Sequence, residues 1–462
     1  MNMIFIILNL EKTIFKYYIV LYIIKSMKNF FKLIEDLPEP SLRFHYGESV
    51  VPHDIIRLKP YSYETTFEKE IRVIFPSNIE SEVAKLFEII QNGDSWPFER
   101  GINRQFNVNF NFKFTKLDEI DINKIESYIM NDESNILICF TSQLENYHYN
   151  RLKALSAIRR KRIQFINIQK FKDNFTKGND IAKKFYALNL GVQLYSKGDG
   201  IPWLLTREVR TKGITYEFAP ENSLIVGISF LRESIGGDKI YYGIAHVIDF
   251  SGLTLKFELF PAKVNPVTGY YIPREHMSKI VKDSIEYYRE KKGSDLSKIY
   301  IYKTTAFIDE EIGGVREGLK ESGDVIYYLN HVKTSGFVVR AYDLNDEDYC
   351  VRRGLCLIDL EEMRTILWTT GRLIGGKKSG RHKLGTPRPI EITVNTNSDL
   401  DKGEILRHIA YQALALTKLD WEHAMWEVRV PAILKYSRRA GKVSFYGNPV
   451  DLISRLDVRD LM

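Results

Sequence analysis

The sequence predicts an α/β fold in two blocks, the first built on a parallel sheet and the second on a mixed sheet. In residues 70–205, short apolar runs alternate with helical stretches, a pattern typical of parallel strands with helices on both faces. In residues 206–462, consecutive apolar runs precede the first helix, which indicates neighbouring strands joined by turns. At 462 residues with 44% hydrophobic content, the chain can bury a core in each block.

Residues 1–41 precede both blocks and begin with a leader rich in Ile, Phe, Leu and Tyr. Its apolar runs, 3–10 and 17–24, are much shorter than the roughly twenty consecutive apolar residues of a membrane span. No small-residue cleavage site follows them, which argues against a signal peptide. Translation from Met27 would make residues 1–26 a misassigned start; a helix that binds a membrane surface or a partner is the other explanation.

The first block is preceded by a segment at 42–69, which opens with a strand at 42–47. Gly and Pro residues within 197–203 mark the turn that ends the block. We therefore expect a Rossmann-like domain at 70–205. Its predicted strands are 71–75, 136–141 and 162–168, and its predicted helices are 78–91, 145–158 and 180–196.

The second block, 206–462, opens with three predicted antiparallel strands, followed by a crossover helix and a parallel strand. This order of elements is the opening of an RNase H-like fold. The predicted strands are 223–230, 240–250, 253–260 and 298–303, and the predicted helices are 275–291, 309–321, 403–417 and 431–440.

Two pairs of polar side chains repeat a helical spacing in the first block. Tyr149 and Lys153 lie four residues apart in a predicted helix, so they share one helix face. Gln193 and Lys197 repeat this spacing on a second helix. Phenol and ammonium groups donate hydrogen bonds, and a helix N-terminus also favours an anion. Either pair alone is typical of a solvated helix face, but both pairs together with Gln164 predict a pocket for one terminal phosphate.

Positive charge is modest in total, at +7, but it is concentrated in two clusters. Basic clusters provide the sequence-independent, salt-sensitive part of nucleic-acid affinity. A solvated surface remains the alternative for each cluster. The first cluster lies within 151–162 and contains Arg159, Arg160, Lys161 and Arg162; the second lies in the Gly-rich stretch 376–388 and contains Lys377, Lys378, Arg381 and Lys383.

The cysteines give no sign of a zinc site or of a disulfide framework. Cys139, Cys350 and Cys356 are odd in number and lack the CxxC spacing. A reduced, cytoplasmic compartment fits this cysteine usage best.

The polar residues of the first block resemble the 5′-phosphate pocket of the MID domain of Argonaute proteins. That pocket has a Tyr-x3-Lys pattern, here Tyr149 and Lys153, followed by a Gln, here Gln164, and by a Lys on the next helix, here Lys197. The resemblance implies that these four side chains bind the 5′ phosphate of a guide strand.

The resemblance also implies a divalent cation, Mg²⁺ or Mn²⁺, between the phosphate, Gln193 and the C-terminal carboxylate at Met462. An α-carboxyl is ionised at neutral pH, and two anions ~4 Å apart repel by roughly 4 kcal/mol at an effective dielectric of 20. A hard cation between them turns this repulsion into attraction.

Four short segments of the second block are similar to motifs of the PIWI domain of the same family: 225–229, 299–305, 385–389 and 430–438. Residues 42–47 resemble the opening strand of that family, so the segment 42–69 is expected to pack on the PIWI domain. The resemblance covers 42–462 and leaves no room for N-terminal and PAZ domains. It implies a short prokaryotic Argonaute with a MID domain at 70–205 and a PIWI domain at 206–462.

The nuclease centre is where the sequence departs from cleaving members of the family. Their acidic positions correspond here to Ser229, Thr304 and Arg438. Hydroxyls and a guanidinium cannot hold the two Mg²⁺ ions of RNase H-type cleavage. Asp309 and its acidic neighbours 310–311 are expected to cap the next helix, whose N-terminus favours negative charge. We therefore expect no cleavage.

The function implied is guide-dependent recognition of nucleic acid, with sequence specificity supplied by base pairing. Family habit suggests an RNA guide, a DNA target from a plasmid or virus, and a separately encoded partner. That partner would supply an N-terminal-like (APAZ-like) module and an effector that causes abortive infection.

Two alternatives stay open. The first is an active RNase H-type nuclease that uses displaced carboxylates such as Asp309 or Asp324. The second is a membrane-associated adaptor that acts through residues 1–26.

Overall fold

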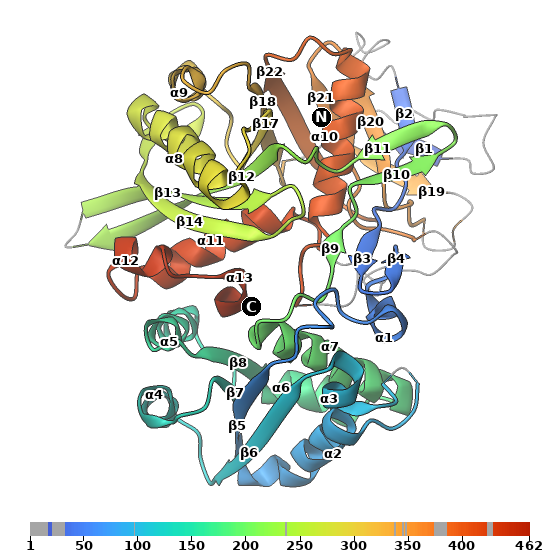
Figure 1. Cartoon of the computed structure of the whole chain (residues 1–462), viewed down its shortest axis with the longest axis vertical. Helices are drawn as coiled ribbons and strands as arrows, with labels where there is room; N and C mark the ends of the chain where they lie inside the picture. Colours follow the sequence, from blue (N-terminus) through green and yellow to red (C-terminus); the bar gives the residue numbers. More distant parts are fainter. Residues whose placement is uncertain are drawn as a thin grey trace. The chain divides into compact units, whose positions relative to one another are not determined.

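The computed structural model describes residues 17–20, 33–96, 98–235, 238–336, 339–343, 346, 349–373, 386–422 and 428–462. Its contacts divide the chain into two compact units, which Figure 1 colours by sequence position. Unit 1 contains residues 1–41, 205–420 and 425–438, and unit 2 contains residues 42–204, 421–424 and 439–462.

Unit 2 is built on a four-stranded sheet in the order β6-β5-β7-β8. All neighbouring strands are parallel, which confirms the predicted parallel sheet. Every residue of β7 is buried, as expected of a central parallel strand covered on both faces. The strands are β5 (Glu68–Pro76), β6 (Asn109–Leu117), β7 (Ile136–Thr141) and β8 (Arg162–Asn167).

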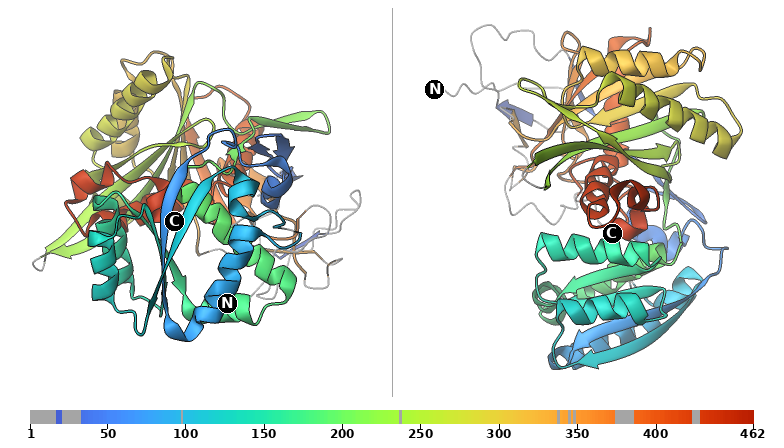
Figure 2. Two further views of the ribbon diagram at one scale, coloured as in Figure 1. Left: turned by 60° about the horizontal axis from the view of Figure 1, so that its bottom comes forward. Right: turned by 90° about the vertical axis from the view of Figure 1, so that its left-hand side faces the viewer.

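Helices cover both faces of this sheet, with α4 (Ile122–Asn131) and α5 (Asn146–Ile158) on one face. Leu152 of α5 and Ile125 of α4 pack there with Leu137 and Ile163 of the sheet. The opposite face is covered by α2 (Glu80–Asn92) and α7 (Asp180–Lys197), as Figure 2 shows. The short helices of the unit are α1 (Ile55–Leu58), α3 (Gly101–Phe106) and α6 (Ile168–Phe171).

Segments from both ends of the described chain complete unit 2. The hairpin of β3 (Leu42–Phe44) and β4 (Gly47–Ser49) belongs to it, and the ring of Phe44 lies 6.3 Å from that of Trp203. The last helices, α12 (Pro449–Ile453) and α13 (Val458–Leu461), belong to it as well. The sequence had instead led us to expect residues 42–69 to pack on the second block and residues 439–462 to lie within that block.

Unit 1 contains a nine-stranded mixed sheet in the order β14-β13-β12-β17-β18-β22-β21-β20-β2. β12 (Ser223–Ile235), β13 (Asp238–Asp249) and β14 (Thr254–Pro261) are antiparallel, whereas β17 (Lys298–Lys303) and β18 (Ile326–Lys333) run parallel to β12. This arrangement confirms the predicted mixed sheet. The remaining strands, all antiparallel to their neighbours, are β22 (Ile390–Thr396), β21 (Arg364–Leu367), β20 (Leu355–Asp359) and β2 (Leu33–Asp36).

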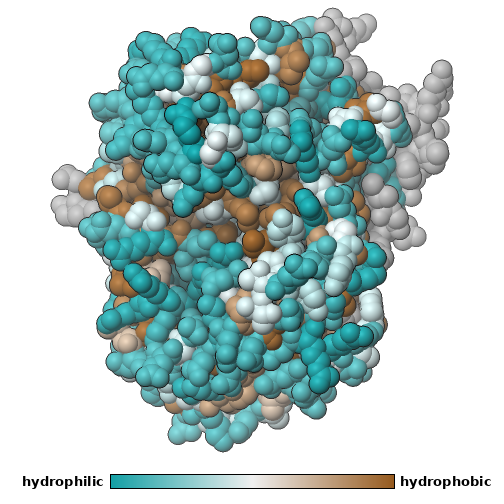
Figure 3. Space-filling model, in the orientation of Figure 1, coloured by the Kyte–Doolittle hydropathy of each residue, from teal (hydrophilic) through white to brown (hydrophobic). Residues whose placement is uncertain are grey.

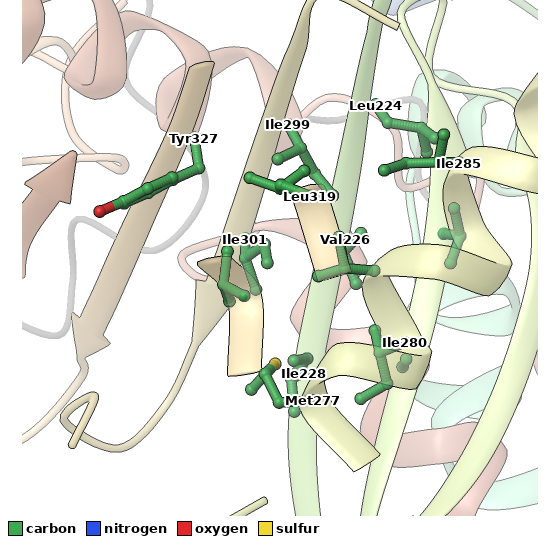
Figure 4. Packing of buried hydrophobic residues seen from close by; sticks show 14 of the residues in the cluster. Leu224, Val226, Ile228, Met277, Ile280, Ile285, Ile299, Ile301, Leu319 and Tyr327 are labelled. Carbon is green, nitrogen blue, oxygen red and sulfur yellow. The ribbon is translucent and has the colours of Figure 1, made fainter. Parts of the chain in front are cut away.

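One face of the mixed sheet packs on α8 (Arg274–Lys292) and α9 (Asp309–Leu319). Alternate residues of β12, namely Leu224, Val226 and Ile228, enter this core beside Met277 and Ile280 of α8 (Figure 4). The intervening residues of β12 face the other side of the sheet.

On that other side, α11 (Ala432–Ser444) passes close to β12. A Cβ at Gly227 would lie 2.9 Å from the backbone of Ile433, so glycine is required there for the close approach. The other long helix of this part of the chain is α10 (Lys402–Leu416).

Tyr17–Val20 forms β1, which pairs antiparallel with β19 (Arg340–Asp343). Residues 17–20 thus form a strand where a helix was the expected alternative, and the role of the leader in binding a membrane surface or a partner stays a prediction. Residues 1–16 and 21–32 lie outside the described part of the chain. Two hairpins, β10 (Glu208–Thr211) with β11 (Ile214–Glu217) and β15 (Lys263–Asn265) with β16 (Gly269–Tyr271), complete the strands of unit 1.

No helix among the described residues is both long and apolar enough to cross a membrane. Hydrophilic side chains cover most of the face seen in Figure 3.

Candidate functional site

Tyr149 and Lys153 lie on one face of α5, as their spacing predicts. The ammonium nitrogen of Lys153 is 5.7 Å from the centre of the Tyr149 ring, and that ring lies 5.4 Å from the ring of Phe165 on β8. Lys153 is only 1% exposed. The pair therefore forms the wall of a buried site.

Lys197, the last residue of α7, meets Lys153 at the end of the chain. Both ammonium groups donate to the main-chain oxygen of Met462, Lys197 over 2.9 Å. Lys153 also donates to Ile163 O over 2.8 Å, and Lys197 to Arg459 O over 3.0 Å. Residues far apart in sequence thus converge, because α13 contacts α5, α7 and β8 near the C terminus marked in Figure 1.

Burial disfavours the protonated forms of these two lysines, although the oxygen of Met462 accepts hydrogen bonds from both. Burial lowers the pKa of Lys153 to about 8, against the opposing influence of the Glu422 carboxylate. Burial also lowers the pKa of Lys197 well below its usual value, and the neighbouring Lys153 adds to this effect. An anion bound beside them would favour the protonated forms of both lysines. The site is therefore suited to a ligand with more than one negative charge.

Gln164 lies on β8, directly after the residue whose carbonyl oxygen binds Lys153. Its amide nitrogen donates to Phe165 O over 3.3 Å, and its buried side-chain oxygen has no hydrogen-bond partner. Strand alternation directs Gln164 away from Ile163, which packs under α5. The Gln164 side chain makes no hydrogen bond to either lysine, and its role as a phosphate ligand stays a prediction.

Gln193 lies one turn before Lys197 and donates to Glu422 O over 2.6 Å. The carboxylate of Glu422 accepts a hydrogen bond from Arg439, which also donates to Leu461 O over 3.2 Å. Burial raises the pKa of Tyr149, and this is the largest effect. The charge of Arg439 lowers the same pKa, and the charge of Glu422 raises it. Sequence reasoning missed Glu422 and Arg439.

The sequence offered one indication for Arg439: it directly follows the segment 430–438 that resembles the PIWI domain, and it lies on α11, a helix near the C terminus. No pattern in the sequence indicated Glu422, because it lies in a short segment between two long helices.

The donors suggested for a cation are the amide of Gln193 and the terminal carboxylate at Met462. In the described part of the chain, no group of three or more His, Cys, Asp or Glu side chains is arranged to hold a metal. Gln193 already donates to Glu422, and both lysines face the main-chain oxygen of Met462. Mg²⁺ requires near-octahedral coordination by oxygen. These two protein groups do not form a cation site by themselves.

The basic cluster at 159–162 is only partly available to a ligand. Arg162 donates to the carboxylates of Asp199 over 2.6 Å and Asp460 over 3.4 Å, and Lys161 donates to Asp132 O. Arg159 and Arg160 are exposed. Arg160, Arg162 and Lys197 line a cavity of about 490 Å³ in unit 2. Lys377, Lys378, Arg381 and Lys383 lie outside the described residues.

In unit 1, Ser229 on β12 is the first of the three positions predicted to replace the acidic residues of a nuclease centre. Its hydroxyl donates to Leu434 O over 3.0 Å and lies 2.7 Å from the hydroxyl of Ser437. Ser229 is 3% exposed, whereas Thr304 and Arg438 are exposed. On α11, the side chain that contacts Ser229 is that of Ser437, the neighbour of Arg438, and the assignment of Arg438 to the nuclease centre stays a prediction.

The acidic residues after β17 do not reach the Ser229 face. Glu311 forms a fully buried ion pair with Lys303 and accepts from Ile308 N over 3.2 Å, which confirms the expected capping of α9. Lys303 pairs with Ile228 in register, so its side chain lies on the α8 face, opposite Ser229.

The structure as a whole has an Argonaute-like fold, in which units 2 and 1 match the MID and PIWI folds of solved Argonautes. Clostridium butyricum Argonaute bound to a guide DNA and a 19-mer target DNA aligns with a TM-score of 0.66 and 16% identity over 92% of this chain. Two structures of Aquifex aeolicus Argonaute align with TM-scores of 0.57 and 0.61, at 16% and 15% identity, over 93% and 94% of this chain.

The aligned part corresponds to 54%, 53% and 57% of those chains, so this chain spans about half the length of the Argonautes it matches. No protein-family model and no curated protein sequence matches it.

Proposed function

We propose that this protein binds a guide strand by its 5′ phosphate and recognises a complementary nucleic acid by base pairing, without cutting it. The observation that carries the proposal is the convergence of Lys153 and Lys197, both 1% exposed, on Met462. Buried charges are unfavourable unless they are paired, and a terminal phosphate offers several charged acceptor oxygens. The Argonaute-like fold supports a strand end as the source of that phosphate.

In this proposal, Tyr149, Lys153 and Lys197 contact the phosphate directly. Arg439 joins them after it leaves Glu422, and Gln164 contributes its amide. A guanidinium suits this task because its planar donors match phosphate geometry.

The proposed divalent cation belongs to the complex with the strand. Gln193 and the carboxylate of Met462 would hold it, and phosphate oxygens would supply the ligands that these groups lack. When bound, the cation neutralises the repulsion between phosphate and carboxylate. Isothermal titration of Mn²⁺ should therefore show binding with a 5′-phosphorylated strand present and none without it. Equal Mn²⁺ binding to the free protein would contradict this assignment.

We also propose that target cleavage is absent. The support is the environment of Ser229, whose hydroxyl is bound to Leu434 and Ser437 and carries no charge for a metal ion. The alternative nuclease finds no support in the buried Lys303–Glu311 ion pair after β17, because this pair lies on the face of the sheet opposite Ser229. Incubation with guide, complementary target and Mn²⁺ should leave the target intact; guide-directed cuts would overturn this proposal.

The biological setting follows as part of the proposal. An RNA guide would direct the protein to invading plasmid or viral DNA, and a separately encoded partner would act as the effector, with abortive infection as the outcome. The similar Clostridium butyricum structure is bound to guide DNA and target DNA, so sequencing the nucleic acids that co-purify with this protein decides the guide chemistry. Co-purification of RNA and DNA in random, unpaired sequences would contradict guided recognition.

A further inference from the structure

Glu422 is an acidic side chain placed directly against polar groups of the proposed phosphate pocket. Its carboxylate accepts a hydrogen bond from Arg439, and its carbonyl oxygen accepts one from Gln193 over 2.6 Å. The side chain is 13% exposed. One residue therefore holds two groups of the pocket, one from α7 and one from α11, in a single arrangement.

The charge of Glu422 extends to the remaining groups of the pocket. Burial lowers the pKa of Lys153 and of Lys197, and Glu422 raises both. The same carboxylate raises the pKa of Tyr149, where burial has the larger effect. A negative charge that influences all three side chains lies close to the place that a phosphate would occupy.

An incoming phosphate would meet this carboxylate as a like charge, and it would also compete with it for Arg439. A phosphate binds a guanidinium with two parallel hydrogen bonds, and two anions in a poorly hydrated site repel strongly. Binding of the phosphate therefore requires that the Glu422 carboxylate release Arg439. It also requires that this carboxylate move away from the two lysines.

We propose that Glu422 is a displaceable latch: it offsets part of the positive charge of the pocket, holds Arg439 and Gln193, and must be displaced before a 5′ phosphate binds. This inference rests on the proposed function and adds a residue that sets the affinity and selectivity of the pocket. A strand has contacts beyond its phosphate that offset the displacement of Glu422. Inorganic phosphate has none, so the latch keeps small anions out of the pocket.

The test compares Glu422→Gln with the unmutated protein in a titration of 5′-phosphorylated and 5′-hydroxyl single strands of one sequence. Glutamine keeps the size of the side chain and an acceptor oxygen for Arg439, but removes the charge. We expect Kd for the phosphorylated strand to fall about tenfold, which corresponds to about 1.4 kcal/mol. Kd for the hydroxyl strand should not change.

Two further variants separate charge from folding. Glu422→Asp keeps the charge, so its Kd for the phosphorylated strand should stay near that of the unmutated protein. Glu88→Gln removes an exposed carboxylate of α2 in the same unit and should change neither Kd. Inorganic phosphate should compete with the strand in Glu422→Gln at concentrations that leave the unmutated protein unaffected.

The outcomes distinguish the latch from the function on which it rests. If the unmutated protein binds both strands equally, the proposed function fails. If it prefers the phosphorylated strand but Glu422→Gln shows no gain, the latch is wrong. If Glu422→Gln binds the phosphorylated strand more weakly and loses dependence on Mn²⁺, Glu422 is a cation ligand and the latch is also wrong.

Discussion

At the scale of single residues, the pocket is defined by buried lysines that converge on the oxygen of Met462. Replacing Lys153 or Lys197 by Ala should raise Kd for a 5′-phosphorylated strand at least about tenfold, because each substitution removes a charge-assisted contact. Kd for the 5′-hydroxyl strand should change little. Lys170→Ala, an exposed lysine of α6 in the same unit, serves as the matched control and should bind as the unmutated protein does.

Adjacent arginines of α11 offer a second test at this scale. Arg439→Gln should weaken binding of the phosphorylated strand about tenfold, since it removes a guanidinium beside Tyr149 and leaves Glu422 facing the phosphate. Arg438→Gln should have no comparable effect, because Arg438 is exposed. Filter binding with labelled strands measures both. Equal losses in the two variants would show that positive charge on α11 acts only through nonspecific attraction.

These residues also show what the sequence could and could not predict about the site. The helical spacing of Tyr149 with Lys153 and of Gln193 with Lys197 was sufficient to place both pairs correctly on α5 and α7. Glu422 escaped prediction because its role depends on a long-range contact with α7 and α11, which no local pattern encodes. Ser437 escaped for a related reason, since a shift of one residue along α11 decides which side chain faces Ser229.

At the scale of elements, the packing of α11 on the mixed sheet depends on a buried histidine of β13. His246 contacts Ile433 O on α11 at 3.3 Å and Thr254 Oγ1 at 2.9 Å, and its ring stacks on Phe257 with 4.2 Å between centres. Burial lowers the pKa of His246 from 6.5 to about 3. The folded protein therefore holds this imidazole neutral over the range in which the unfolded chain binds a proton.

This depressed pKa fixes the sign of a pH effect on stability. The contribution of His246 is fully present above pH 6.5 and is lost as pH falls from 6.5 toward 3, at about 1.4 kcal/mol per pH unit. His246→Gln should make the pH dependence of stability less steep in urea unfolding at pH 7 and pH 5, whereas His276→Gln on α8 should leave its slope unchanged. Parallel curves for the unmutated protein and His246→Gln would contradict the assignment.

The elements themselves were largely predictable, because apolar periodicity and Gly-containing turns identify strands and helices locally. The order of β12, β13, β14, α8 and β17 follows the prediction. β6 and α4 were not predicted, although Phe110, Phe112 and Phe114 of β6 alternate with polar residues as a half-buried strand does; α4 buries only Ile125 and Ile129. The pairing of β2 with β20 was also out of reach, since it joins residues from opposite halves of the chain.

At the scale of the whole molecule, the chain returns to unit 2 at its end, and this return builds the pocket. Met462 is 3% exposed and its oxygen accepts from both Lys153 and Lys197. A short Gly-Ser extension after Met462 should displace this residue and weaken binding of the phosphorylated strand about tenfold. The same extension placed before Met1 should leave binding unchanged, and a competition assay with labelled strand compares the two proteins.

The composition of unit 2 was not apparent from the sequence, because linear blocks suggest boundaries at single positions. Residues 42–69 and 439–462 join the parallel-sheet unit through contacts such as that between Phe44 and Trp203 and those of α13. A folding unit assembled from distant segments cannot be recognised from composition or periodicity alone.

The central claim is that the two buried lysines and their neighbours bind a terminal phosphate. The most direct measurement is the affinity of the unmutated protein for two single strands of identical sequence, one with a 5′ phosphate and one with a 5′ hydroxyl, at a fixed salt concentration. The phosphorylated strand should bind at least about tenfold more tightly, since only its phosphate pairs with Lys153 and Lys197. Equal affinities for the two strands would contradict it.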